Sequence, residues 1–136
     1  KDLSILYTLT MTHDDYIVNA LRAHSLCKSG RSAPLISMLS TKKFNLEFEL
    51  LNEKHRHCTL AHTAALYNQT GLLHILLQGH DIPEVSFRID CVDENEATPL
   101  MYAIDGGNLA SVFLLLQFGA NVNIKGTMKF RSHCNI

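Results

Sequence analysis

A 33-residue unit at residues 93–125 restricts the fold of this chain more than any other feature of its sequence. It reads as two short helices joined by a tight turn. Thr98 can cap the first helix through its hydroxyl, and Pro99 suits the first helical position, where its missing N–H removes no hydrogen bond. Gly106 and Gly107 supply the backbone freedom that ends this helix and turns the chain.

The two predicted helices of this unit depend on neighbouring structure for their stability. Leu100, Ala103 and Ile104 fall three and four residues apart, which places them on one face of the first helix. Asn108 can cap the second helix, and Gly119 suits the left-handed conformation that closes it. Both helices are shorter than the roughly 12 to 15 residues that an isolated helix needs in water. The sequence therefore predicts that the unit stacks against others.

This unit resembles an ankyrin repeat. Its length and its Thr98-Pro99-Leu100 opening match the signature of that family, in which a turn is followed by two helices. The resemblance implies an all-α repeat solenoid of stacked helix-turn-helix repeats with β-hairpin fingers. It also implies a non-catalytic module that binds a partner protein, as part of a larger regulatory or scaffold protein.

Two further copies of the unit precede it along the chain. The copy at residues 54–92 keeps a threonine at Thr59 and carries His62 at the family's histidine position, where the resemblance implies a hydrogen-bonding role beside the turn. The copy at residues 16–53 is weaker, and Gly30 separates its two predicted helices. We therefore predict a single domain over residues 1–136, with an N-terminal lid at 1–15, repeats at 16–53, 54–92 and 93–125, and the start of a truncated repeat or a tail at 126–136.

The two junctions between the copies share an alternating pattern. Apolar residues alternate with polar ones from Phe44 to Leu50 and again from Val85 to Cys91. Alternation with a period of two is typical of a strand that buries one face. We therefore predict that two of the β-hairpin fingers are lengthened, with a longer irregular loop at each junction as the alternative.

The second helix of the last repeat predicts that more chain packs against it. Residues 112–116 are apolar on every side, which suits a helix covered on both faces. The sequence reaches Ile136 before another helix can form, so we expect a longer array that has been truncated. The ends of such arrays normally need a polar capping repeat, and a chain this short is therefore expected to be able to associate with itself.

Composition excludes several classes of partner. Twelve Lys and Arg residues against thirteen Asp and Glu give a formal net charge of −1, which offers no general attraction to nucleic acid or to an anionic membrane. No apolar run approaches the roughly 18 residues expected of a membrane-spanning helix. The four scattered cysteines favour reduced thiols in an intracellular protein, cytoplasmic or nuclear. We expect a protein partner, with no nucleic acid bound directly and no membrane.

The sequence holds no motif that predicts catalysis or a bound cofactor. No glycine-rich loop is followed by the Lys and the Ser or Thr of a phosphate site, and Gly106-Gly107 lies between two helices. The carboxylates of Asp93, Glu94 and Glu96 could act as a pair or hold a metal ion. At the tip of a finger they are better explained as a solvated turn.

A partner of such an array is expected to bind the finger tips and the exposed face of each first helix. The positions that match this surface are His55, Arg56, Cys58, Leu66, Tyr67, Glu94, Asn95, Ala97, Asp105 and Lys125. Arg56 and Tyr67 are the strongest candidates, because arginine and tyrosine are over-represented where interfaces concentrate their binding energy. Each position could instead be an ordinary solvated residue.

A cluster of histidine and cysteine favours a second hypothesis, a structural module stabilised by zinc. Its members are His55, His57, Cys58 and His62. Imidazole and thiolate are ligands that zinc prefers, and alternate residues of an extended segment could direct two of them toward one ion. Against this hypothesis, no second cysteine lies nearby, and His62 already has a structural role under the resemblance.

Overall fold

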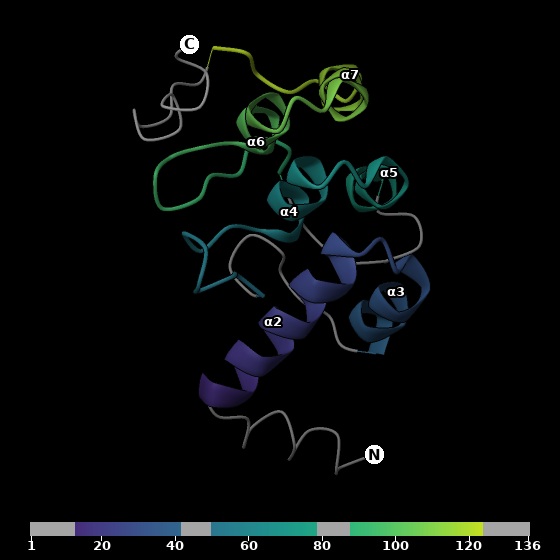
Figure 1. Ribbon diagram of the computed structural model, residues 1–136, viewed down its shortest axis with the longest axis vertical. Helices are drawn as coiled ribbons and strands as arrows, with labels where there is room; N and C mark the ends of the chain where they lie inside the picture. Colours follow the sequence, from purple (N-terminus) through teal and green to yellow (C-terminus); the bar gives the residue numbers. More distant parts are fainter. Residues whose placement is uncertain (1–12, 42–49, 79–87, 124–136) are drawn as a thin grey trace.

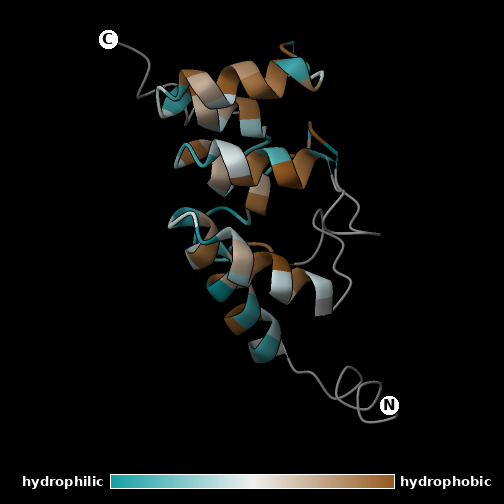
Figure 2. Ribbon diagram, turned by 90° about the vertical axis from the view of Figure 1, so that its right-hand side faces the viewer, coloured by the Kyte–Doolittle hydropathy of each residue, from teal (hydrophilic) through white to brown (hydrophobic). Residues whose placement is uncertain are grey.

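The described residues of the computed structural model, 13–41, 50–78 and 88–123, fold into three helix pairs stacked on one another (Figure 1). The pairs are α2 (His13–Lys28) with α3 (Ser32–Thr41), α4 (Leu60–Leu66) with α5 (Thr70–Gln78), and α6 (Pro99–Asp105) with α7 (Leu109–Gln117). Figure 2 shows the same three layers from the side. The predicted all-α repeat solenoid is confirmed.

The helices form two columns. α4 packs between α2 and α6, α5 packs against α7, and each first helix packs on the second helix of its own pair. In Figure 1, α2, α4 and α6 follow one another along one side of the stack, with α3, α5 and α7 along the other. Each layer therefore buries its apolar surface by contact with the next one, as helices too short to stand alone require. None of the helices in the described residues is long and apolar enough to cross a membrane.

Two threonines begin the first helices of the second and third layers. Thr98 Oγ1 accepts a hydrogen bond from the Met101 N–H (3.3 Å), and Pro99 is the first residue of α6, as predicted. Thr59 forms a capping box with His62, because the Thr59 N–H donates to His62 Nδ1 (3.0 Å) while the His62 N–H donates to Thr59 Oγ1 (3.4 Å). This second bond strengthens the start of a helix that lacks the proline.

Asn108 does not cap α7 with its side chain, contrary to the prediction. Its side-chain amide donates instead to the carbonyls of Ala65 (2.9 Å) and Leu66 (2.6 Å), at the end of α4. Gln69, which stands 39 residues earlier in the sequence, donates in the same way to the Lys28 carbonyl at the end of α2 (3.0 Å). These amides satisfy carbonyls that a helix end leaves without partners, and they tie each layer to the one before it.

The glycine predictions are confirmed, but one apolar residue lies on the wrong side of its helix. Gly107 and Gly119 adopt φ angles of 69° and 92°, in the left-handed region where a side chain would cost energy. Ile104 was expected on the buried face of α6, yet it is 53 % exposed. Leu100 and Ala103 are buried as expected, and Tyr102, which this pattern left out, is completely buried as well.

The predicted lengthened strands are not observed where the structure describes them. Most of both segments lies outside the described residues. At the described end of the second segment, the Cys91 N–H donates to the Arg88 carbonyl (3.1 Å) and closes a turn, so the chain is not extended there. Within the described ranges there is no strand, and β pairing is limited to an isolated antiparallel bridge between Asn52 and Cys58.

The boundary of the predicted lid also changes. The lid was placed at residues 1–15, but α2 begins at His13, so residues 13–15 belong to the first helix. The helical pattern in the sequence begins at Tyr16, whereas the helix itself extends one turn further toward the N-terminus. The rest of the lid and the tail at 126–136 lie outside the described residues.

The last helix of the stack shows apolar side chains to solvent. Leu115 of α7 is completely buried, whereas Leu109 is 68 % exposed, Phe113 67 % and Leu116 41 %. The three exposed residues are spaced four and three apart, so they share one face of the helix. α7 is therefore apolar on every side, as the sequence indicated, but in this structure one of its faces remains in solvent.

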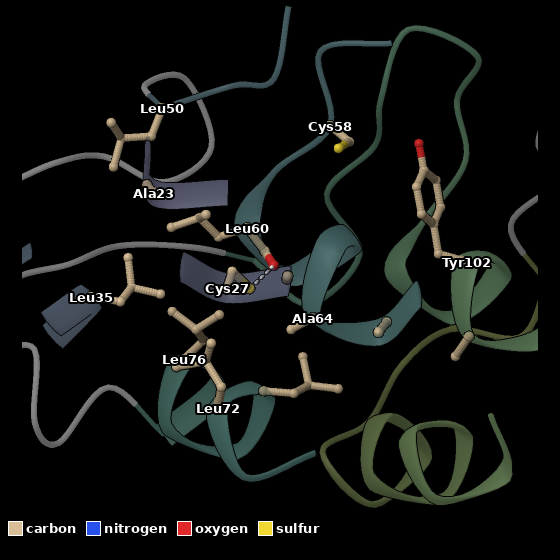
Figure 3. Close-up of a cluster of buried hydrophobic side chains, with 14 of the residues drawn as sticks. Ala23, Cys27, Leu35, Leu50, Cys58, Leu60, Ala64, Leu72, Leu76 and Tyr102 are labelled. Carbon is tan, nitrogen blue, oxygen red and sulfur yellow. Dashed lines mark hydrogen bonds between the residues drawn. The ribbon is translucent and has the colours of Figure 1, made fainter. Parts of the chain in front are cut away.

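The apolar core runs through all three layers (Figure 3). Small buried side chains allow the first helices to approach closely, and they are Ala20, Ala23, Cys27, Ala61, Ala64, Ala65 and Ala103. Leucines of the second helices fill the space behind them, and they are Leu35, Leu39, Leu72, Leu73, Leu76 and Leu115. The Cys27 thiol donates to the Leu60 carbonyl at the start of α4 (3.4 Å), which links the first two layers.

The three described cysteines are buried thiols, so we expect them to resist modification while the chain is folded. Burial raises the pKa of Cys58 to about 11 and raises the pKa of Cys27 further, which leaves little reactive thiolate. In a Cys134→Ser variant, which removes the thiol outside the described residues, reaction with a disulfide reagent should be at least ~100-fold slower for the native chain than for the unfolded chain. The absorbance of the released thiol measures both rates. A fast-reacting thiol under native conditions would show that the core opens.

Candidate functional site

A closed turn between Asn52 and Cys58, here called the Asn52 turn, precedes α4. The Asn52 N–H donates to the Cys58 carbonyl (3.0 Å), and the Asn52 carbonyl accepts from the N–H groups of His55 (3.0 Å) and His57 (2.9 Å). Arg56 and His57 both adopt left-handed backbone conformations, with φ angles of 56° and 54°. This conformation costs roughly 1 to 2 kcal/mol per residue other than glycine, so it persists because the surrounding hydrogen bonds hold it. The turn therefore presents its side chains in a fixed arrangement.

A second turn, between Asp93 and Ala97, precedes α6 and is here called the Asp93 turn. It is built around a buried carboxylate. Asp93 Oδ1 accepts from the N–H groups of Asn95 (2.8 Å) and Ala97 (2.9 Å), and Oδ2 accepts from the Tyr102 hydroxyl (2.5 Å). Burial, together with this last bond, raises the pKa of Tyr102 well above its usual range. The Asp93 carboxylate therefore stabilises the turn.

The two turns are joined to each other. The Glu94 N–H donates to the Arg56 carbonyl (2.9 Å), and His57 Nδ1 lies 2.6 Å from Glu94 Oε2. The side chains of His57 and Glu94 are 40 % and 57 % exposed, so solvent weakens the side-chain contact and the backbone bond is the firmer link. Figure 1 shows both turns on the same side of the stack, next to the column of first helices.

A groove of about 360 Å³ lies between α2, α4 and the Asn52 turn. The residues that line it are Leu21, His24, Ser25, Lys28, Asn52, His55, Thr63, Leu66 and Tyr67. The four from α2 recur at helical spacing, so they form one face of that helix. The volume falls within the roughly 300 to 1,000 Å³ of pockets that hold ligands.

The polar groups on the floor of this groove are already engaged. His24 Nδ1 lies 2.6 Å from Thr63 Oγ1, and His24 Nε2 lies 2.7 Å from the Leu50 carbonyl. Burial lowers the pKa of His24 to about 4, against the smaller opposing effect of the bond to Leu50, so the ring is neutral at neutral pH. The carbonyl can only accept, so Nε2 donates to it and Nδ1 accepts from the Thr63 hydroxyl. Neither ring nitrogen is left to act as a base or to bind a ligand.

The rim of the groove combines an aromatic surface with a positive charge. Lys28 Nζ lies 5.0 Å from the centroid of the Tyr67 ring, and Tyr67 is 43 % exposed. An ammonium over an aromatic face gains about 0.5 to 1 kcal/mol at an exposed site. Leu66, half-buried beside Tyr67, adds apolar surface. These three side chains can contact a partner directly.

The structure brings six of the ten sequence candidates into two neighbouring groups. The three that line the groove are His55, Leu66 and Tyr67. The three that belong to the linked turns are Arg56, Glu94 and Asn95. These two groups meet at the Asn52 turn, which contributes to both.

Two of the remaining candidates are wrong as surface residues. Cys58 is 0 % exposed and Ala97 is 1 % exposed, and both belong to the apolar core. A side chain with no exposed area offers nothing to a partner protein. Asp105 ends α6, in the layer after the groove, and Lys125 lies outside the described residues.

Several residues of the groove were missed by the sequence candidates. Lys28 precedes Leu66 by 38 residues, which is the spacing between corresponding positions of the first two repeats. Applying that spacing to Leu66 would have found Lys28, and helical spacing from Lys28 leads to Leu21 and Ser25. Asn52 carries no such signal, because its place in the groove depends on how the turn closes.

The zinc hypothesis is not supported. Both ring nitrogens of His62 are engaged, since Nδ1 accepts from the Thr59 N–H and Nε2 lies 2.7 Å from the Ala97 carbonyl. Burial raises the pKa of Cys58 to about 11, which opposes the thiolate that zinc requires. In the part of the chain that the structure describes, no three His, Cys, Asp or Glu side chains gather as metal ligands.

The chain is similar to proteins that contain ankyrin repeats. A family model described as ankyrin repeats, in three copies, matches residues 23–126. A curated Gallus gallus protein, "Arf-GAP with coiled-coil, ANK repeat and PH domain-containing protein 2", is 56 % identical over 34 residues, which are 25 % of this chain and 4 % of that protein. The crystal structure of the human ASB11 ankyrin repeat domain matches with a TM-score of 0.59 and 23 % identity, over 76 % of this chain and 42 % of that one. The chain thus spans less than half the length of either relative.

Proposed function

Because the chain belongs to the ankyrin-repeat family, we propose that it is a binding module that holds a segment of a partner protein in the groove beside the Asn52 turn. Ankyrin repeats generally act as protein-binding modules. The observation that carries the proposal is one groove of about 360 Å³ whose rim combines Tyr67, Leu66 and the ammonium of Lys28. The linked turns extend this surface with Arg56 and Glu94.

The state of the polar groups around the groove favours binding over catalysis. A general base needs a lone pair that can reach the substrate. The ring nitrogens of His24 and His62 are engaged with protein groups, and the Asp93 carboxylate accepts two hydrogen bonds from its own turn and one from the Tyr102 hydroxyl of α6. These groups hold the surface in shape, which reduces the entropy lost when a partner binds.

We further propose that the chain works inside the cell as the recognition part of a larger protein. The three described cysteines are buried thiols, which suits a reducing compartment. The name of the Gallus gallus relative sets ANK repeats beside Arf-GAP, coiled-coil and PH domain regions. The net charge of −1 supports a protein partner over nucleic acid.

The proposed surface predicts the behaviour of a double variant, Arg56→Ala with Tyr67→Ala. Peptides are selected from a displayed random library on the wild-type chain, and calorimetry then gives their Kd for both chains. We expect binding at least ~tenfold weaker in the variant, because arginine and tyrosine are the side chains whose truncation most often costs an interface more than about 1 kcal/mol. The Tm should fall by no more than about 4 °C, because neither side chain belongs to the core.

A matched control removes the same residue types elsewhere. Tyr16→Ala with Arg22→Ala changes two exposed residues of α2 that do not line the groove. This control should bind the selected peptides as the wild type does. Peptides that bind the Arg56 and Tyr67 variant with unchanged Kd would remove the surface from consideration.

A further inference from the structure

The groove carries an unbalanced positive charge. Among the nine described residues that line it there is no Asp or Glu, and Lys28 contributes an ammonium group. The two lining histidines do not add to this charge. His24 is neutral for the reasons given above, and burial, with a contribution from Arg56, lowers the pKa of His55.

The charge of Lys28 has a defined position. Lys28 is the last residue of α2, and its carbonyl accepts from the Gln69 side chain (3.0 Å), which fixes the end of the helix. Its ammonium lies over the Tyr67 ring, at 5.0 Å from the centroid. Among the described residues, this ammonium contacts an aromatic face and no carboxylate. A carboxylate from outside can therefore approach it without displacing an ion pair between described residues.

Beside this charge the groove offers a guest polar and apolar surface in about equal parts, and some of its polar groups are already bonded within the protein. The His24 and Thr63 side chains are bonded to each other, and the Asn52 side-chain oxygen accepts from the Lys54 N–H (3.0 Å). A guest side chain gains little from these polar groups. It gains most by removing the side chains of Leu21, Leu66 and Tyr67 from water.

We propose that the occupant of the groove is an extended segment of a partner protein in which an apolar side chain contacts Leu21, Leu66 and Tyr67 while a neighbouring carboxylate binds the Lys28 ammonium. This inference rests on the proposed function and adds the chemistry of the partner to it. An exposed ion pair contributes only about 0 to 1 kcal/mol, so the apolar contact supplies most of the affinity. Lys28 supplies selectivity, because a basic guest would place like charges together.

The test is a charge reversal at Lys28. Peptides selected on the wild-type chain should carry Asp or Glu next to an apolar residue, and Lys28→Glu should raise their Kd at least ~tenfold by replacing attraction with repulsion. A second selection on Lys28→Glu should recover peptides with Lys or Arg in place of the acidic residue. Arg22→Glu is the control, because it makes the same charge change at an exposed position of α2 outside the groove. It should leave both Kd and peptide composition unchanged.

A milder variant keeps the test decisive if Lys28→Glu disturbs the fold. Lys28→Gln retains the length of the side chain and removes its charge, and we expect about threefold weaker binding of the acidic peptides. The rise of Kd with added salt that we expect for the wild type should also be lost, because screening acts on the ion pair.

The outcomes separate this inference from the proposed function. Selected peptides that depend on Tyr67 but show no acidic preference, and bind Lys28→Glu unchanged, would overturn the carboxylate assignment alone. Peptides indifferent to both Tyr67 and Lys28 would overturn both. Acidic peptides that depend on both residues support both.

Discussion

Replacing His62 by alanine should lower the free energy of unfolding by about 3 to 5 kcal/mol, a large part of the roughly 5 to 15 kcal/mol margin of a domain. His62 is 0 % exposed. Its Nδ1 accepts from the Thr59 N–H, so the proton is on Nε2, which donates to the Ala97 carbonyl (2.7 Å). Its ring also packs edge-on against Tyr102, with centroids 4.6 Å apart. Alanine would leave the buried carbonyl and N–H without partners and open a cavity between two layers.

Urea unfolding followed by circular dichroism measures this loss. His74→Ala is the matched control, because His74 is half-buried and contacts the exposed Phe118 ring (centroids 5.5 Å apart). We expect the control to cost about 1 kcal/mol or less. If His62→Ala cost no more than the control, the link from α4 to the Asp93 turn would not matter for stability.

The elements that the sequence predicted correctly are those fixed by local chemistry. Thr98, Pro99 and Gly107 act within one or two turns of their own position, through a cap, a preset φ angle and a left-handed backbone. These local preferences do not depend on which structure packs against the unit. The hydrogen-bonding role of His62 was also predicted correctly, because the resemblance to ankyrin repeats assigns that role to a histidine at this position.

The incorrect predictions concern side chains whose partners lie far away in the sequence. Asn108 has the right chemistry for a cap, but carbonyls about 40 residues earlier compete for its amide and satisfy it better. Cys58 and Ala97 were placed on the surface because each lies on a turn. The left-handed residues Arg56 and His57 close the Asn52 turn, and the Cys58 side chain lies in the core. No local sequence pattern indicates that two successive residues other than glycine will adopt a left-handed backbone conformation.

The groove was only partly predictable for a related reason. Tyr67 and Leu66 could be named because their repeat keeps enough of the family pattern. Lys28 belongs to the weakest repeat, and its contribution depends on the distance between α2 and α4. That distance is set by small residues packed between the helices, such as Ala23 and Ala64. Packing of this kind is a property of the stack and not of a single unit.

Acidification should destabilise the folded chain well before its carboxylates are protonated. Burial lowers the pKa of His24 to about 4 and that of His62 to about 4, with smaller opposing effects from their bonds to carbonyls. In the unfolded chain both should titrate near 6.5, so between these values the unfolded state binds more protons and stability falls as pH falls. The two histidines together should remove about 4 kcal/mol of unfolding free energy between about pH 7.5 and about pH 5. Urea unfolding at a series of pH values measures this change.

The slope of that change identifies its source. At about pH 5.5, two buried neutral histidines predict that the free energy of unfolding changes by about 2.4 kcal/mol per pH unit, and one predicts about 1.2 kcal/mol. Glutamine can replace the hydrogen bonds of His24 without titrating, so His24→Gln should halve the slope whatever it does to stability at neutral pH. A slope unaffected by this substitution would assign the acid sensitivity to other groups. Stability that rose on acidification would mean that the buried rings gain protons in the folded state, in contradiction to their neutral contacts with the Leu50 and Ala97 carbonyls.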